Sequence, residues 1–175
     1  MIRILIIEDS SVVAMLLRAI IEAEPDMTVI GHASDGREGV QLANELKPDL
    51  ITMDIRMPVM DGFEATRMIM STCPTPIVVV TSSAYKAEQK TTFRAIEEGA
   101  LAVLDKPHGL SHPDFEEMSS ELIDVIRAMS EVPVVKRRLP KAARTKDDIN
   151  IFEKAINQVE RNYKIITIGC STGGP

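Results

Sequence analysis

The sequence predicts an α/β domain built on a doubly wound, five-stranded parallel sheet, and three observations support this. Five short apolar runs recur within the first 106 residues of the 175-residue chain. Each run is nearly continuous rather than alternating, as expected for strands buried on both faces of a parallel sheet. Stretches with apolar residues at helical spacing lie between the runs, and such alternation of strand and helix is typical of this fold class.

The strands are expected at the apolar runs, residues 2–7, 27–33, 50–53, 76–82 and 100–106. The helical stripes consist of Val13, Leu16, Leu17 and Ile20; Val40, Ala43 and Leu46; and Phe115, Met118, Leu122 and Ile126. Ser10 or Ser11 can cap the first helix and Asp35 the second, because short polar side chains accept hydrogen bonds from free helix amides. We assign these elements to a first domain, residues 1–128.

The chain changes character after the first domain. Residues 129–147 lack an apolar stripe and contain two prolines, so they are expected to form a linker. A new helical stripe then consists of Ile149, Phe152, Ile156 and Val159. The apolar run at residues 164–169 follows it as a strand. Residues 148–175 are therefore expected to open a second α/β domain that is cut off.

Charge is unevenly distributed along the chain. The net charge is −6, but residues 1–130 hold 11 Lys or Arg against 21 Asp or Glu, whereas residues 131–146 carry +5. An acidic folded part argues against a nucleic-acid-binding domain. No apolar stretch reaches ~18 residues, and the N-terminus turns acidic too early for a signal peptide. With Cys73 and Cys170 not spaced as a metal site, we expect a cytoplasmic protein with reduced thiols.

Polar side chains stand where four of the predicted strands end. They are Glu8 and Asp9 after the first strand, Asp54 after the third, Thr81 in the fourth and Lys106 after the fifth. Ligands of open α/β sheets bind beyond the carboxyl ends of the strands, so these side chains are expected on one rim. Two like charges ~4 Å apart repel by about 4 kcal/mol at an effective dielectric constant near 20. Lys106 offsets one of the three negative charges, and a divalent cation would offset the other two.

The chemistry expected at this rim is phosphoryl transfer. Hard oxygen ligands favour Mg²⁺, or Mn²⁺, as the cation. Once the charge is balanced, a phosphoryl group can approach Asp54, whose carboxylate can act as a nucleophile and form an acyl phosphate. Lys106 would neutralise phosphoryl oxygens and the Thr81 hydroxyl would donate a hydrogen bond to one of them. Taken singly, each residue is explained as well by a cap, a strand or a surface charge, so the combination carries the prediction.

A flavodoxin-like nucleotide-binding site is the alternative for this domain. Such a site holds phosphate with backbone amides and small residues after the first strand. Glu8 and Asp9 occupy that position here and would repel phosphate unless a metal intervened. We therefore reject this alternative.

The segments IIEDS, MDIRMPVMDG, VVVTSSA and LDKP resemble the marks of the two-component response-regulator receiver family over residues 1–126. The resemblance implies a CheY-like fold with strand order 2-1-3-4-5 and phosphorylation of Asp54. The Mg²⁺ ligands it implies are Asp9, Asp54 and the backbone carbonyl of Arg56, with Glu8 acting through water. Thr81 and Lys106 would be phosphoryl-binding switch residues, and the peptide bond before Pro107 would be cis.

One position departs from the family pattern. Many receivers carry Tyr or Phe three residues before the lysine, and here that position is Val103. A rotating aromatic side chain is therefore not expected to transmit the signal. Arg56 and Ser83 flank the predicted site and are candidates for setting the lifetime of the phosphoryl group.

Residues 169–173 satisfy the pattern G-x-S-x-G, with Ser171 at its centre. Small residues let a strained serine stand clear between strand and helix, although a glycine-rich phosphate-binding turn fits the pattern equally well. A receiver, a basic linker, a helix and this turn together resemble the chemotaxis protein-glutamate methylesterases of the CheB type. That resemblance implies that Ser171 is the nucleophile of an enzyme that demethylates glutamyl esters, and deamidates glutamines, on chemoreceptors.

In the family that the chain resembles, the histidine and aspartate partners lie after the serine, so the resemblance implies that these 175 residues alone are inactive. His32, His108 and His112 are expected to be surface or packing residues. The methylesterase family implies that the receiver inhibits its own catalytic domain until a CheA-type histidine kinase phosphorylates it. It implies neither nucleic-acid binding nor membrane insertion. Two alternatives stay open: a receiver with a DNA-binding output, and a stand-alone phospho-signalling module.

Overall fold

The computed structural model describes residues 1–82, 89–109 and 111–136. The elements in chain order are β1 (Ile2–Ile7), α1 (Ser11–Glu22), β2 (Met27–Ala33), α2 (Gly36–Leu46), β3 (Leu50–Met53), α3 (Gly62–Thr72), β4 (Ile77–Thr81), α5 (Gln89–Glu98), β5 (Ala102–Asp105) and α6 (Phe115–Ser130). The predicted second domain, residues 148–175, lies outside the described residues, as does most of the predicted linker.

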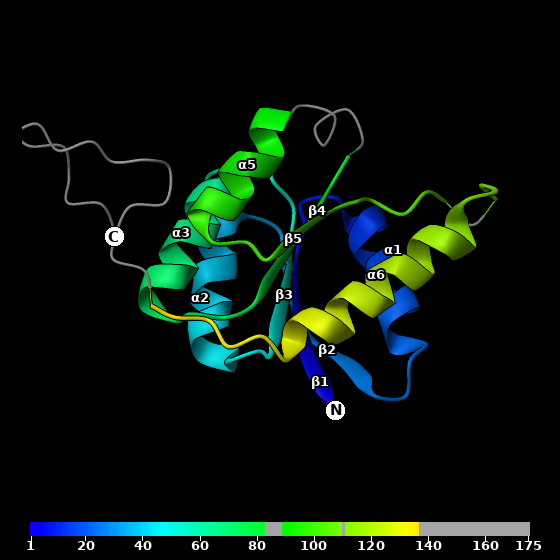
Figure 1. Cartoon of the computed structure of the whole chain (residues 1–175), viewed down its shortest axis with the longest axis horizontal. Coiled ribbons are helices and arrows are strands. Elements are labelled where there is room, and N and C mark those ends of the chain that lie inside the picture. Colours follow the sequence, from blue (N-terminus) through cyan, green and yellow to red (C-terminus); the bar gives the residue numbers. More distant parts are fainter. Residues whose placement is uncertain (83–88, 110, 137–175) are drawn as a thin grey trace, which may run out of the picture. The chain divides into compact units, whose positions relative to one another are not determined.

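The five strands form one parallel sheet in the order β2-β1-β3-β4-β5, which confirms the predicted fold class and strand order. Helices α1 and α6 cover one face, whereas α2, α3 and α5 cover the other (Figure 1). The last two strands are shorter than the apolar runs that predicted them. In the fifth run, Ala100 closes α5 instead, donating its N–H to the carbonyl of Ala95 at 3.0 Å.

Two apolar layers hold the helices to the sheet. Along β1, Ile4 and Ile6 belong to the layer beneath α1 and α6, whereas Leu5 and Ile7 belong to the layer beneath the other three helices. All four side chains are at most 1% exposed. Burial on both faces is the reason why the strands read as continuous apolar runs in the sequence.

Side-chain caps start the first three helices. The hydroxyl of Ser10 accepts a hydrogen bond from the Val13 N–H at 3.5 Å, so Ser10 rather than Ser11 caps α1. Asp35 caps α2, as predicted, and Asp61 caps α3. Each cap satisfies an N–H group that has no partner within its helix.

After α6, the chain crosses from one face of the sheet to the other. Val134 packs against the layer beneath α2, α3 and α5, whereas Ile126 of α6 belongs to the opposite layer. Figure 1 shows this segment running past the end of the sheet toward α2 and α3. Among the described residues, none of the helices has the length and apolar character that a membrane span requires.

Candidate functional site

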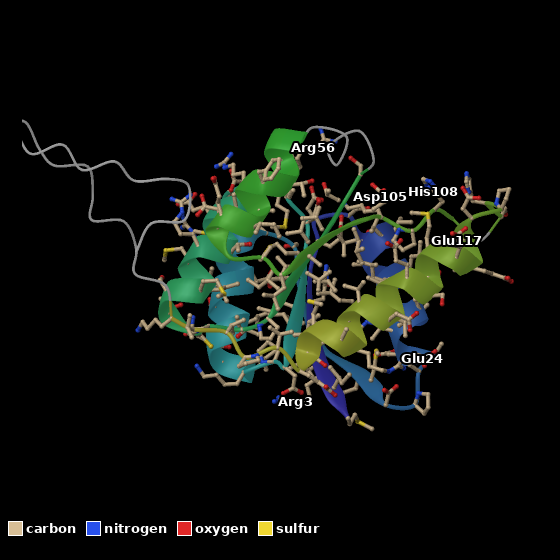
Figure 2. The ribbon with its side chains drawn as sticks, viewed as in Figure 1. Arg3, Glu24, Arg56, Asp105, His108 and Glu117 are labelled. Carbon is tan, nitrogen blue, oxygen red and sulfur yellow. The ribbon has the colours of Figure 1, made fainter. Side chains whose placement is uncertain are left out.

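The carboxyl ends of the strands enclose a pocket of about 360 Å³. Its lining residues are Glu8, Asp9, Ser10, Asp54, Arg56, Ser82 and Lys106. Figure 2 shows Arg56 and Asp105 at this end of the sheet and Arg3 at the opposite end. Segments after β1, β3, β4 and β5 thus contribute to one pocket, as expected of a parallel sheet.

Backbone hydrogen bonds place the first carboxylates side by side. The N–H of Glu8 donates to the carbonyl of Ala33 at 2.9 Å, and the N–H of Asp54 donates to the carbonyl of Ile7 at 2.9 Å. The sheet pairing therefore continues one residue beyond β1 and β3. Glu8 is 1% exposed and Asp54 is 5% exposed, so both carboxyl groups are buried at the end of the sheet.

Lys106 bridges these two carboxylates. Its Nζ donates to Glu8 Oε1 at 2.9 Å and lies 2.9 Å from Asp54 Oδ2. It also lies 2.8 Å from Glu8 Oε2, but outside hydrogen-bonding geometry. Oε2 is therefore buried in contact with the ammonium, but it accepts no well-directed hydrogen bond among the described residues. Its remaining acceptor capacity is open to a cation or a water.

Burial and charge shift the pKa values in this pocket. Burial of the Glu8 carboxyl raises its pKa above the usual range, the hydrogen bond from Lys106 opposes that effect, and the charge of Asp54 adds to it. Burial alone would lower the pKa of Lys106, but Glu8 and Asp54 outweigh it and raise that pKa. The ammonium is thus held charged while the carboxylates compete for it.

The carboxylate oxygens are arranged as a cation would require. One oxygen from each of Glu8, Asp9 and Asp54 lies within 4.8 Å of the others. Asp54 Oδ1 already accepts the Ile55 N–H at 2.7 Å, but a carboxylate offers about four acceptor positions. The three carboxylates outnumber the two cationic residues, Lys106 and Arg56, that line the pocket. This set of hard oxygen ligands fits a divalent cation.

The hydroxyl predicted for this pocket is placed differently from expectation. Thr81 is the last residue of β4, pairs in register with Asp105 and is 1% exposed. Its carbonyl accepts the N–H of Lys106 at 2.8 Å, but Thr81 is not among the residues that line the pocket. Ser82, the next residue, lines it instead. Ser83 lies outside the described residues.

The predicted cis bond before Pro107 is wrong, because the described residues contain no cis peptide bond. An X–Pro bond prefers trans by about 0.5–1 kcal/mol unless packing selects cis. Here Lys106 reaches both Glu8 and Asp54 with the following bond trans. Lys106 can therefore contact both carboxylates without a cis bond before Pro107.

The loop after β3 contains a feature that the sequence did not reveal. Val59 has φ 65°, a left-handed conformation that is strained for a β-branched residue, and the N–H of Met60 donates to the carbonyl of Pro58 at 2.6 Å. A Cβ at Gly62 would overlap the carbonyl oxygen of Asp54. The tight turn therefore folds back on the residue that carries the central carboxylate, and glycine permits that approach.

Comparison with known proteins agrees with this geometry. A family model described as response regulator receiver domain matches residues 4–112. Protein-glutamate methylesterase/protein-glutamine glutaminase 2 of Methanospirillum hungatei is 45% identical over 175 residues, covering 100% of this chain and 50% of the relative. The corresponding Thermotoga maritima protein is 41% identical, covering 99% of this chain and 48% of the relative. The chain thus spans about half the length of the curated relatives it matches.

Solved structures show the same fold. The response regulator domain of Thermotoga maritima CheB is 42% identical, with a TM-score of 0.68, covering 75% of this chain and 98% of that structure. The receiver domain of Mycobacterium tuberculosis NarL, 22% identical with a TM-score of 0.61, shares the fold. The strand order, the acidic pocket at the sheet's carboxyl end and these matches lead to one conclusion: the chain belongs to the response regulator receiver domain family.

Proposed function

We propose that residues 1–128 are the phosphorylation-controlled receiver of a chemotaxis protein-glutamate methylesterase, and that Asp54 is its phosphoacceptor. The observation that carries this proposal is the position of Asp54, buried beside two other carboxylates and paired with Lys106 at 2.9 Å. A carboxylate in such surroundings is crowded by like charge, and its ammonium partner is poised to neutralise an incoming phosphoryl group.

Asp9, Asp54 and the backbone carbonyl of Arg56 would hold Mg²⁺, or Mn²⁺, with Glu8 acting through water. The three clustered carboxylate oxygens support this assignment. When bound, the cation supplies positive charge to the phosphoryl oxygens. Asp9 directly, and Glu8 through the water, would orient it.

The proposed reaction moves a phosphoryl group from a phosphohistidine of a CheA-type kinase to Asp54. A carboxylate oxygen of Asp54 attacks phosphorus, an O–P bond forms, and the N–P bond breaks with its electron pair returning to the imidazole. Lys106 stays within reach of the phosphoryl group, which carries about 1.5–2 negative charges at neutral pH in place of the single charge of the carboxylate. Thr81 is buried beside the pocket, so its hydroxyl would bind the phosphoryl group only after turning toward it.

The output of this receiver, in our proposal, is a serine methylesterase. Residues 129–147 would be the basic linker, and residues 148–175 the start of a catalytic domain with Ser171 as nucleophile. Relatives named as methylesterases align over all of this chain, which favours that output over a DNA-binding one or a stand-alone module. Phosphorylation would relieve inhibition of the catalytic domain, which would demethylate glutamyl esters and deamidate glutamines on chemoreceptors in the cytoplasm.

Intact-mass analysis after incubation with acetyl phosphate and Mg²⁺ tests the phosphoacceptor. The wild-type chain should gain the mass of one phosphoryl group, and Asp54→Ala should gain none. Asp114→Asn is a matched control, because Asp114 is an exposed carboxylate whose side chain makes no capping hydrogen bond, and it should be labelled like wild type. Equal labelling of Asp54→Ala and wild type would refute the assignment.

A further inference from the structure

We infer that His32 is a positioning residue for the acidic pocket: its imidazole holds the Glu8–Asp9 peptide and so aims the Asp9 carboxylate. The inference deepens the proposed function and rests on it, because it concerns the same cation site. His32 lies on β2 and is partly buried, so its role is more specific than the surface or packing role that the sequence indicated.

The contact itself is short and its direction is determined by chemistry. Nε2 of His32 lies 2.8 Å from the carbonyl oxygen of Glu8. A carbonyl oxygen can only accept, so Nε2 carries the proton and donates it. The N–H of Glu8 donates to the carbonyl of Ala33 at 2.9 Å. Strand β2 therefore holds both backbone groups of Glu8, one through its main chain and one through a side chain.

The hydrogen bond reaches Asp9 through the planarity of the peptide. The Glu8 carbonyl and the nitrogen and Cα of Asp9 lie in one plane, so a fixed carbonyl oxygen fixes the direction in which Asp9 leaves the strand. The Asp9 carboxylate is exposed, and it takes part in none of the hydrogen bonds found among the described residues. Its aim therefore depends on the backbone.

The Glu8 carboxylate, by contrast, has direct supports. It accepts hydrogen bonds from Lys106 Nζ at 2.9 Å and from the Ser10 N–H at 3.2 Å. The bond from the Glu8 N–H to Ala33 is the last backbone hydrogen bond between these strands, and among the described residues no backbone N–H donates to the Glu8 carbonyl. The imidazole of His32 supplies that donor. Loss of this hydrogen bond should change the position of the Asp9 carboxylate more than that of the Glu8 carboxylate.

Two substitutions separate positioning from packing. His32→Leu keeps side-chain bulk but cannot donate, whereas His32→Gln keeps an N–H donor. In calorimetric titrations of the 175-residue chain, His32→Leu should bind Mg²⁺ about 10-fold more weakly, as for other residues that orient metal ligands, and His32→Gln should bind nearly as wild type. At saturating Mg²⁺ the rate of labelling by acetyl phosphate should be the same in all three proteins.

Met15→Ala is a matched control, because Met15 is 71% exposed and lines the same cavity of about 150 Å³ as His32. It should leave Mg²⁺ affinity unchanged. Metal-free readouts come from NMR: the wild-type imidazole should show the Nε2–H tautomer, and the Glu8 carbonyl ¹³C resonance should move in His32→Leu but little in His32→Gln.

An Nδ1–H tautomer in the wild type would overturn the inference even if His32→Leu failed to fold. So would wild-type affinity in His32→Leu, or equal losses of affinity and thermal midpoint in both variants. A wild-type chain that binds no Mg²⁺ and takes no phosphoryl group would instead refute the proposed function, and this inference with it. Normal wild-type behaviour with unchanged variants would refute the inference alone.

Discussion

The two ends of the β-sheet treat their carboxylates in opposite ways. At the amino-terminal end, Asp49 accepts the backbone N–H of Arg3 at 2.8 Å, and Arg127 pairs with Glu24 and Asp26 at 3.1 and 3.0 Å. Figure 2 shows Arg3 and Glu24 at this end. The hydrogen bond from Arg127 lowers the pKa of Asp26 below its usual range. Arg127 is shared as well, but the side chains of Glu24 and Asp26 are 37% and 45% exposed, so solvent also surrounds these acids.

At the carboxyl-terminal end, Glu8, Asp9 and Asp54 converge and Lys106 is shared between two of them. Burial raises the pKa of Glu8, the opposite direction from Asp26. Exposed acids can share one guanidinium at little cost, whereas a buried excess of carboxylates is tolerated where a ligand is expected. This difference in burial supports a ligand site at the carboxyl-terminal end of the sheet without reference to any relative.

The largest difference between the two ends of the sheet is expected when the ammonium of Lys106 is removed. Lys106→Met leaves two buried carboxylates without their cation and removes a partner of the phosphoryl oxygens. We expect the initial rate of labelling by acetyl phosphate to fall about 100-fold, the usual effect of losing one such donor. Arg3→Met, a cation lost from the opposite end, should label at the wild-type rate. A wild-type rate in Lys106→Met would contradict this reading of the bridge.

Glu8→Gln should change how stability depends on pH. Because the folded-state pKa of Glu8 lies above its ordinary value of 4.5, the folded protein takes up a proton before the unfolded chain does as pH falls. In metal-free buffer, the free energy of unfolding of the wild type should therefore rise relative to that of Glu8→Gln as the pH falls from neutral to 4.5. Urea unfolding at several pH values measures the difference. A difference that stays constant with pH would argue against a raised pKa.

Relief of backbone strain should give a smaller effect. Val59 is 70% exposed and has φ 65°, and asparagine adopts this conformation more easily. Val59→Asn should raise the free energy of unfolding by about 1 kcal/mol, the approximate cost of a left-handed conformation. Lys47, at the amino-terminal end, also has positive φ, but it is unbranched and ends a helix. Lys47→Asn should therefore raise the free energy of unfolding by less than Val59→Asn does. Urea unfolding measures both, and a larger gain in Lys47→Asn would contradict strain at Val59.

The smallest effect is expected from Arg127→Met, because its ion pairs are solvent-exposed. Asp26 has a lowered folded-state pKa, so its contribution is present above its ordinary value of 3.8 and is lost as pH falls through the folded pKa. Wild type and Arg127→Met should therefore converge in acid, the opposite trend from Glu8→Gln. Thermal unfolding against pH measures this, and parallel curves would contradict it.

The sequence was sufficient to predict the five-stranded sheet and the polar residues that meet at the carboxyl ends of its strands. Continuous apolar runs identified β1 to β3 to the residue, and parallel strands necessarily bring Glu8, Asp54 and Lys106 to one end. The predicted stripes did not include α3 or α5, and in α5 the exposed Phe93 and Ile96 mean that the apolar residues do not form one buried stripe. Fold-level reasoning therefore works where burial dictates residue type.

Local geometry was not accessible in the same way. Burial decided that Ser82 rather than Thr81 lines the pocket, because Thr81 is only 1% exposed. The contact of His32 with Glu8 joins residues 24 positions apart and follows no sequence pattern. Each of these depends on tertiary contacts rather than on residue spacing.

The central claim is that the excess carboxylates at the carboxyl-terminal end of the sheet form a divalent-cation site around Asp54. Calorimetric titration of Mg²⁺ into the wild-type chain and into the Asp9→Asn/Asp54→Asn double variant tests it most directly. The account predicts one site in the wild type and no binding in the variant. No binding in the wild type, or equal binding in both proteins, would contradict it.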